Sequence, residues 1–189
     1  MPFRVNGSVL TEDQGIRPET TLEGLADLKP AFREDGVITA GNSCPTNDGI
    51  SVALLMSEEK ARELRLEPLA RIIGIGVAGV KPQVMGLGPI PSTRKALRHA
   101  GIRADQIDRV EFNEAFAAQV IPSLRDLGIS ADRANVNGGS IAIGHPLGAT
   151  GARLVTTVAR ELQRSGGRYG LATQCIGAGM GISTIIERI

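Results

Sequence analysis

The amino-acid sequence predicts a layered α/β fold, and three observations support this prediction. From residue 69 onward, apolar runs of strand length alternate with longer segments in which apolar residues recur with helical spacing. Glycines follow two of the predicted helices, at Gly101 and at Gly166. With 189 residues the chain is long enough to bury a substantial core, and we expect one domain or one and a half.

The first 68 residues are predicted to be less regular. Residues 1–46 are rich in Gly, Pro, Asn, Asp and Thr without clear periodicity, so we expect irregular chain there. A short helix is expected to start at Thr20–Glu23, because a threonine cap and an acidic first turn satisfy free amides. Gly49–Ser57 is a nearly unbroken apolar run, typical of a strand buried on both faces. Glu58–Arg65 indicates a polar surface helix that stops before Pro68.

Two strands and a helix are predicted between residues 69 and 112. Leu69–Val80 is rich in Ile, Val and Gly, which indicates a strand whose glycines mark a bend or a close approach. Pro91–Ala100 has helical spacing, and Gly101 follows it as a left-handed cap. Ile107–Phe112 is a short strand that leads into the next helix.

The remaining chain is predicted to contain two helices and two strands. The first helix runs from Glu114 to about Leu127, and Pro122 should bend it because proline removes one hydrogen bond. The second starts near Pro146, which suits a first helical position, and ends at Gly166-Gly167. Its buried face is predicted to be Leu147, Gly151, Leu154, Val155, Val158 and Leu162. The chain closes with two strands around a glycine turn, Tyr169–Cys175 and Gly181–Glu187.

Composition excludes several classes of partner. Basic and acidic residues number 21 and 20, so neither nucleic acid nor an anionic membrane surface is expected as the main partner. The longest apolar stretch, Ile72–Val80, is far shorter than the roughly 20 residues that a membrane-spanning helix needs. We find no signal peptide, and two cysteines make no disulfide framework, so we expect a cytoplasmic protein.

Two glycine-rich stretches have the character of an active site. Asn135–Gly151 contains His145, and Cys175–Gly181 begins with one of the two cysteines. Glycine lets a substrate approach the backbone closely, and a histidine beside a cysteine points to thiol chemistry. The second histidine, His99, lies in an ordinary helical pattern and is expected to have no catalytic role.

Four segments resemble the signature motifs of the thiolase family. They are Thr39-Ala40-Gly41-Asn42 with Asn47-Asp48-Gly49, Asn113–Gln119, the loop from Asn137 to Pro146, and Cys175-Ile176-Gly177-Ala178-Gly179. They follow the family's order at compatible spacings, and the resemblance covers the chain from about Asp13 to its end. It implies a thiolase-like layered α/β fold and reversible acyl transfer between an acyl-CoA and acetyl-CoA, through an acyl-cysteine intermediate.

The resemblance also assigns four catalytic roles. Cys175 is the acid/base that moves the proton of the acetyl-CoA methyl group, although a lone cysteine is more often a small buried residue. His145 activates the nucleophile, and its place before a helix start favours neutral imidazole. Asn113 holds a water in the first oxyanion hole, and a plain helix N-cap is its alternative role. The backbone amide of Gly177 belongs to the second oxyanion hole.

The substrates implied are coenzyme A thioesters, and we expect neither a resident cofactor nor a metal. The resemblance places seven residues at the coenzyme A site: Arg17, Ala31, Phe32, Ala40, Met85, Ala115 and Phe116. Core packing is an equal alternative for the apolar ones. Two positions depart from the family pattern, since Cys44 replaces a serine that contacts pantetheine and Pro45 replaces a glycine.

The family's nucleophilic cysteine belongs to an amino-terminal motif that these 189 residues do not contain. We therefore interpret residues 1–46 as the remnant of the loop domain and residues 47–68 as a strand and helix of an incomplete amino-terminal domain. Residues 69–189 are interpreted as the carboxy-terminal thiolase domain. The strand within 47–68 would expose apolar surface or require a partner, either in a homo-oligomer or as a complementary amino-terminal half.

Three functions compete on this basis. The first is a thiolase portion that works with a separately supplied amino-terminal half. The second is a truncated, inactive protein that binds coenzyme A or serves as an assembly module. The third, a decarboxylating ketoacyl synthase, is less favoured, because those enzymes use two histidines where this chain has the Cys175-x-Gly turn.

Overall fold

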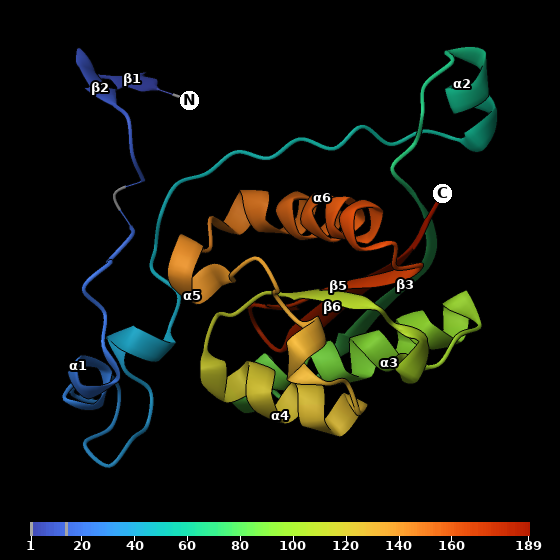
Figure 1. Cartoon of the computed structure of the whole chain (residues 1–189). Coiled ribbons are helices and arrows are strands. Elements are labelled where there is room, and N and C mark those ends of the chain that lie inside the picture. Colours follow the sequence, from blue (N-terminus) through green and yellow to red (C-terminus); the bar gives the residue numbers. More distant parts are fainter. Residues whose placement is uncertain (1, 14) are drawn as a thin grey trace.

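The computed structural model describes residues 2–13 and 15–189. Its main body is a four-stranded sheet with helices on both faces, α6 on one face and α3 and α4 on the other (Figure 1). The strands of this sheet are β3 (Ala70–Gly79), β4 (Arg109–Phe112), β5 (Tyr169–Ile176) and β6 (Met180–Arg188). The three helices are α3 (Pro89–Ala100), α4 (Ala117–Leu127) and α6 (Leu147–Ser165). The predicted layered α/β fold is confirmed.

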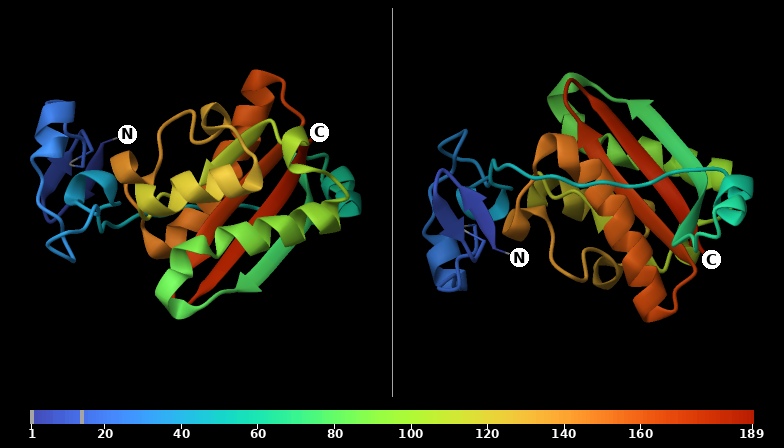
Figure 2. Two further views of the ribbon diagram at one scale, coloured as in Figure 1. Left: turned by 90° about the horizontal axis from the view of Figure 1, so that it is seen from below. Right: turned by 90° about the horizontal axis from the view of Figure 1, so that it is seen from above.

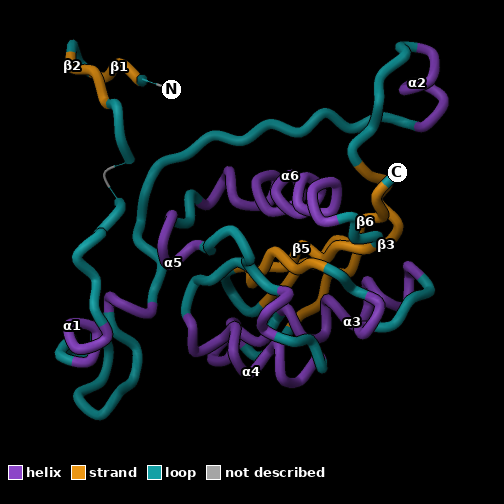
Figure 3. The backbone as a smooth tube through the Cα atoms, in the orientation of Figure 1, coloured by secondary structure: helices purple, strands orange, loops and turns teal. Residues whose placement is uncertain are grey.

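The strand order β3-β6-β5-β4 determines where functional groups can meet. β4 and β5 pair in parallel, with Phe112 opposite Thr173, whereas β6 runs antiparallel to both β5 and β3. Because parallel strands end at the same edge of a sheet, the residues that follow β4 and β5 lie close together. Figure 2 shows this sheet from its two sides, and Figure 3 shows the loops that leave its edge.

Each face of the sheet has its own apolar core. Against α3 and α4 the buried side chains include Ile107, Phe112, Leu124, Leu171 and Ile185. Against α6 they are Leu154, Val158, Ala159, Leu162, Ala172 and Ile186. The helical spacing of the α6 residues is the amphipathic pattern that the sequence predicts, although Leu147 in that pattern is 82% exposed.

Two glycines allow α3 to lie directly on β3. A Cβ atom at Gly76 would come within 2.1 Å of the Ser92 carbonyl oxygen, and one at Gly74 within 2.5 Å of the Ala96 carbonyl oxygen. The predicted close approach at the glycines of β3 is confirmed, because the backbone of α3 occupies the space that side chains at Gly74 and Gly76 would need.

We expect Gly76→Ala to destabilise the protein by about 3 kcal/mol, because the added methyl group forces α3 away from the sheet. Urea denaturation followed by circular dichroism measures the loss. Gly79→Ala in the same strand is the matched control, since its Cβ would meet nothing nearer than 3.9 Å. Equal losses for the two variants would contradict the packing described here.

Most elements predicted after residue 68 are confirmed, with small shifts at their ends. Gly101 and Gly166 adopt the left-handed conformation at the carboxyl ends of α3 and α6, with φ of 68° and 73°. The predicted helix from Glu114 begins later, at Ala117, with Phe116 in the N-cap position. Pro146 caps α6 rather than standing inside its first turn.

The prediction of a buried strand at Gly49–Ser57 is wrong for this structure. The segment has no strand partner, and Ile50, Val52 and Leu54 are 94%, 83% and 79% exposed. It crosses the outer side of α6 as extended chain (Figures 1 and 2), where the Ser51 hydroxyl donates to the Ala149 carbonyl at 2.5 Å. An apolar run forms a strand only where a neighbouring strand accepts its hydrogen bonds, and the described residues supply none here.

The first part of the chain contains more structure than the sequence analysis predicts. β1 (Phe3–Val5) and β2 (Ser8–Leu10) form a hairpin through Asn6-Gly7, whose positive φ values of 48° and 84° suit a type I′ turn. The predicted short helix is confirmed as α1 (Leu22–Ala26), with Thr21 capping it. The predicted surface helix is confirmed as α2 (Glu58–Glu63).

The remaining short helices lie in the connections. They are α5 (Ser140–Ile143) and the 3₁₀ helices Ala40–Asn42, Pro82–Leu87, Ala104–Gln106 and Ala131–Arg133. Within residues 2–13 and 15–189, no helix is long and apolar enough to cross a membrane.

Candidate active site

Cys175 lies near the carboxyl end of β5, at the sheet edge where the glycine-rich loops gather. Its side chain is 9% exposed, and its Sγ is 3.5 Å from Oε1 of Gln119 on α4. The turn that follows includes Ala178 and Gly179, both with positive φ, and a Cβ at Gly179 would come within 2.5 Å of the Val80 carbonyl oxygen. This crowded turn holds the end of β5, and therefore Cys175, in one position.

Gly177 borders open space, in contrast to Gly179. A Cβ at Gly177 would meet no atom within 4 Å. A ligand can therefore approach the backbone from the side on which a Cβ atom would stand.

Asn113 follows β4, next to the end of β5. Its backbone amide donates to the Thr173 carbonyl at 2.9 Å, which ties it to the neighbouring strand. Its side chain is fully buried, and Oδ1 accepts a hydrogen bond from the Ser140 hydroxyl at 2.7 Å. Nδ2 has no partner among the described residues. The N-cap alternative is wrong, because Phe116 occupies that position of α4.

A donor such as Asn113 Nδ2, buried without a partner, carries a desolvation cost that an incoming acceptor would remove. The site therefore offers a buried hydrogen-bond donor directly after β4, the strand that pairs with the Cys175 strand β5.

His145 is held by two contacts that fix the orientation of its ring. Its backbone amide donates to Asn47 Oδ1 at 2.9 Å, and its Nδ1 is 2.7 Å from the Thr150 hydroxyl oxygen. The Thr150 hydroxyl donates to the Pro146 carbonyl at 2.9 Å, so its oxygen accepts from Nδ1–H. In the neutral ring, Nε2 then carries the lone pair and is available as a base.

Burial lowers the pKa of His145 below its ordinary value of 6.5, and the positive charge of Arg153 lowers it further. This direction agrees with the predicted preference for neutral imidazole, and burial is its largest cause, followed by Arg153. The other histidine, His99, is an exposed residue of α3 whose Nδ1 lies 2.6 Å from the carbonyl oxygen of Ile75 in β3.

A clamp built on Glu114 and Asn135 joins the Asn113 segment to the loop that leads to His145. Asn135 exchanges hydrogen bonds with the backbone of Phe112 at 2.8 and 2.9 Å and donates to Glu114 Oε1 at 2.6 Å. Glu114 Oε2 accepts from the Ile141 amide at 3.1 Å. A Cβ at Gly139 would lie 2.2 Å from the Glu114 carboxyl carbon, so this carboxylate occupies the space that glycine leaves.

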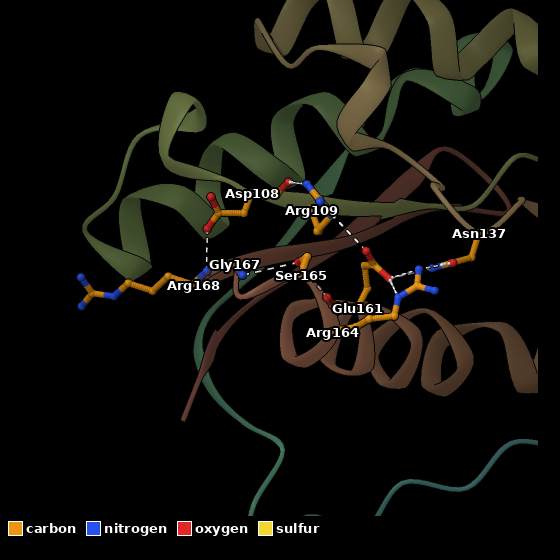
Figure 4. A network of polar contacts seen from close by, with 8 residues as sticks. All are labelled: Asp108, Arg109, Asn137, Glu161, Arg164, Ser165, Gly167 and Arg168. Atoms are coloured by element: carbon orange, nitrogen blue, oxygen red, sulfur yellow. Dashed lines mark hydrogen bonds and ion pairs between the residues drawn. The ribbon is translucent and has the colours of Figure 1, made fainter.

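The same loop is fastened to α6 by a second network, shown in Figure 4. Glu161 is 6% exposed, and its carboxylate accepts from Arg109 at 3.3 Å and from Asn137 at 3.0 Å. Arg164 donates to both Glu161 and Asn137. Because the loop is held on both sides, the positions of Asn113 and His145 are set by the sheet and by α6 together.

The residues predicted to bind coenzyme A are brought only partly toward this site. Phe32 and Phe116 make an edge-to-face contact with ring centroids 6.3 Å apart, and Phe32 is 72% exposed. Ala115 is buried, and Met85 is half-buried. Arg17, Ala31 and Ala40 are exposed on the first part of the chain. Their role in binding stays a prediction.

Cys44 belongs to the same neighbourhood as Cys175. Its amide donates to the Ala115 carbonyl at 3.0 Å, and Ser43 bridges to Phe116. Burial raises the pKa of the Cys44 thiol, and Cys175 adds to the rise. The departure from the family pattern noted in the sequence thus stands beside the acid/base candidate.

Sequence reasoning missed four residues that hold the site: Asn47 as the partner of His145, Thr150, Ser140 and Arg153. Asn47 is 98 residues from His145 along the chain, so no local pattern connects them. Thr150 is five residues from His145 and Ser140 is 27 residues from Asn113, so only the folded loop shows which atoms these two hydroxyls face.

Glu111 is a buried carboxyl on β4 beneath this site. Burial raises its pKa from 4.5 to about 7, Glu114 and Glu161 raise it as well, and Arg153 opposes them. Between pH 4.5 and about 7, Glu111 therefore keeps its proton in the folded protein, whereas the unfolded chain has already released it. It follows that the free energy of unfolding falls as the pH rises from 4.5 through 7.

We expect Glu111→Gln to remove this pH dependence and to stabilise the protein at pH 8 by about 3 kcal/mol relative to wild type. Chemical denaturation at pH 5 and pH 8 provides the test. Glu34→Gln, at an exposed position, is the control and should leave the difference between the two pH values unchanged. A wild-type stability that rises over this range would contradict the assignment.

Comparison with known proteins places this geometry in a family. Residues 66–188 match the family model described as thiolase, C-terminal domain, and residues 1–59 match the thiolase N-terminal domain. A 3-ketoacyl-CoA thiolase of Aliivibrio fischeri is 50% identical over 185 residues, covering 96% of this chain and 48% of the relative. An acetyl-CoA acetyltransferase of Chromobacterium violaceum is 50% identical over 176 residues, covering 93% and 45%.

Solved structures agree with the sequence comparison. The acetyl-CoA acetyltransferase of Bacillus anthracis superposes with a TM-score of 0.94 at 45% identity, covering 100% of this chain and 48% of that one. Human mitochondrial 3-ketoacyl-CoA thiolase in complex with CoA gives a TM-score of 0.88 at 40% identity, with the same coverage. The chain thus spans about half the length of the relatives that it matches.

Proposed function

The chain belongs to the thiolase family, and from that premise we propose that it supplies the acid/base half of a thiolase active site. The reaction is acyl transfer between an acyl-CoA and acetyl-CoA, either as thiolysis of a 3-ketoacyl-CoA or as formation of acetoacetyl-CoA. The nucleophilic cysteine is contributed by polypeptide outside these 189 residues. We expect this chemistry in the cytoplasm.

One observation carries this proposal: Cys175 lies near the end of β5 and Asn113 directly follows the parallel neighbour β4, Asn113 Nδ2 has no partner among the described residues, and the His145 loop is hydrogen-bonded to Asn113 through Ser140. A thiol, a buried amide donor and an imidazole with a free Nε2 are the groups that carbon-acid and acyl-transfer chemistry requires.

In the synthetic direction, the Cys175 thiolate takes a proton from the methyl group of acetyl-CoA. The negative charge moves to the thioester oxygen, where Asn113, acting through a water, stabilises it. The enolate carbon then attacks the acyl group on the nucleophilic cysteine, forming the C–C bond and releasing that cysteine as a thiolate. In thiolysis the same bond breaks, and Cys175 returns the proton to the departing acetyl-CoA carbon.

His145 serves the nucleophile. With Nδ1–H donated to Thr150, its Nε2 accepts the thiol proton of the nucleophilic cysteine and so generates the attacking thiolate. The backbone amide of Gly177, open to an approaching ligand, donates to the oxyanion of the acyl group.

The coenzyme A moiety is proposed to lie along the first part of the chain. Phe32, Phe116 and Met85 supply apolar contacts to pantetheine, Ala31, Ala40 and Ala115 line the same path, and Arg17 meets the nucleotide end. Cys44, where the family pattern has a serine, is expected to weaken this binding, because a thiol is a poorer hydrogen-bond donor than a hydroxyl.

The apolar surface around residues 50–56 supports a complementary polypeptide as partner. Ala53 and Leu55, with Ile72 and Ile75 of β3 and Leu154 of α6, line a groove of about 350 Å³. Exposed apolar surface of this extent favours burial against another chain. We propose an amino-terminal thiolase half, or a second copy of this chain, as the occupant.

Mixing experiments test the proposal. The chain is combined with the amino-terminal half of the A. fischeri relative, and thiolysis of acetoacetyl-CoA is followed by the loss of its absorbance. We expect thiolysis in the mixture and none with either half alone. A half whose nucleophilic cysteine is changed to alanine provides the negative control. A stable complex without thiolysis would overturn the catalytic assignment.

An inactive module that binds coenzyme A or serves in assembly is the second candidate, favoured by the Cys44 and Pro45 departures at the pantetheine site. It predicts coenzyme A binding by calorimetry and no acylated cysteine by mass spectrometry in the mixture. Acylation of the complementing half on incubation with acetyl-CoA would exclude it.

A further inference from the structure

Asn113 is the member of the proposed site whose usefulness depends most on orientation. A side-chain amide has one acceptor end and one donor end, and only the donor end stabilises negative charge. A water held by Nδ2 keeps both of its protons for the developing oxyanion, whereas with the amide turned over the carbonyl oxygen would take one of these protons. Some contact must therefore select one of the two orientations.

The selecting contact is the hydroxyl of Ser140. Ser140 is fully buried, at the first position of α5, and its Oγ lies 2.7 Å from Asn113 Oδ1. The same Oγ accepts a hydrogen bond from Arg153 Nη2 at 2.7 Å. A guanidinium is a donor only, so Arg153 fills a lone pair of the serine oxygen and leaves the serine proton to be donated.

The direction of this chain of hydrogen bonds is therefore fixed from Arg153 through Ser140 to Asn113. The serine proton requires an acceptor, and Oδ1 of Asn113 provides it. In the opposite orientation Nδ2 would donate to the second lone pair of Ser140 Oγ and Oδ1 would replace it as the buried atom without a partner, but the serine proton would also lose its acceptor, at a cost of about 1–3 kcal/mol. Nδ2 is consequently the end of the amide that stays free.

We propose that Ser140 is a positioning residue, which orients Asn113 so that Nδ2 serves the oxyanion formed when the acetyl-CoA methyl group loses its proton. The inference rests on the proposed function of Asn113. The effect of Ser140 should be limited to deprotonation of the methyl group, because acylation of the nucleophilic cysteine uses His145 and the Gly177 amide instead. A loss confined to methyl deprotonation is the signature that distinguishes positioning from general support of the loop.

The test uses Ser140→Ala in the complex of the chain with a complementing amino-terminal half. Two rates are compared with wild type: exchange of the acetyl-CoA methyl protons with D₂O, followed by NMR, and acylation of the nucleophilic cysteine, followed by mass spectrometry. We expect exchange to fall by about ten- to a hundredfold, less than the loss of an oxyanion donor itself, and acylation to change by less than about twofold.

Ser140→Cys is the graded control, because a thiol of similar size is a weaker donor and should give an intermediate exchange rate. Thermal unfolding followed by circular dichroism checks that both variants remain folded. Unchanged exchange in Ser140→Ala would overturn the proposal, as would equal losses in exchange and acylation.

A second measurement on the 189-residue chain alone does not depend on catalysis. The side-chain amide protons of Asn113 are identified in a ¹⁵N–¹H spectrum by their loss in Asn113→Asp. We expect them to shift or broaden in Ser140→Ala, because the amide is released. Unchanged resonances would overturn the role of Ser140. Shifted resonances in a chain whose wild-type complex shows no methyl exchange would instead sink the proposed function and leave the orientation by Ser140 standing.

Discussion

Replacing Cys175 by serine is expected to reduce exchange of the acetyl-CoA methyl protons by about 10³-fold or more in the complex with an amino-terminal half. A hydroxyl is nearly isosteric with a thiol, but it is a much weaker acid. Almost none of it is deprotonated near neutral pH, so serine cannot serve as the base. The measurement is the disappearance of the methyl signal in D₂O. Acylation of the separate nucleophilic cysteine should persist, because Cys175 takes no part in that step.

The structure explains why serine should preserve the fold at this position. Cys175 is 9% exposed, and its hydrogen-bond partner, Gln119 Oε1, accepts equally well from a hydroxyl. A Cys175→Ser complex that still exchanges the methyl protons at the wild-type rate would show that another group is the base.

Replacing His145 by glutamine is expected to have the second largest effect, slowing acylation of the nucleophilic cysteine by about 10²- to 10³-fold. Glutamine can keep a contact with Thr150, but it supplies no base in place of Nε2. The pH dependence provides a further signature. Because burial and Arg153 lower the pKa of His145 below 6.5, the wild-type dependence on this group should appear only in more acidic solution.

His99→Gln is the matched control, since it removes the other histidine from an exposed position of α3 that contacts the middle of β3 at Ile75 rather than the site. It should leave acylation unaltered. If both substitutions slowed acylation to the same degree, the effect would come from stability rather than from proton transfer, and the assignment of His145 would fail.

The sequence predicts best those helices whose apolar residues recur at helical spacing and whose last turn is followed by a glycine. α3 and α6 end at Gly101 and Gly166 because the left-handed conformation is easily reached only without a side chain. In the strand Ala70–Gly79, the glycines alone predict a close approach, although the sequence does not show that α3 is the neighbour.

The segment 49–57 shows what local pattern cannot supply. Its apolar run satisfies every local criterion for a buried strand, yet burial depends on a neighbouring strand, and that strand is not part of the described chain. The hairpin at Asn6-Gly7 is the reverse case. There the turn dipeptide was present in the sequence, but the general irregularity of residues 1–46 obscured it.

The candidate site divides in the same way. Cys175, His145 and Asn113 stand in motifs that a reader of the sequence can find. The residues that orient them cannot be found in this way, because Asn47 contacts His145 from 98 residues away along the chain and Arg153 contacts Ser140 from 13 residues away. Local motifs therefore indicate which residues do the chemistry, whereas the direction of each hydrogen bond depends on how distant segments pack together.

The exposed segment from Ile50 to Met56 has a consequence for the behaviour of the isolated chain. Its seven residues, Ile-Ser-Val-Ala-Leu-Leu-Met, carry no charge and no proline, which is the composition of sequences that stack into intermolecular β-sheets. The chain lays this segment across α6 with its main-chain groups largely unpaired. We therefore expect free protein at high concentration to aggregate, and a chain that pairs with this segment to suppress the aggregation.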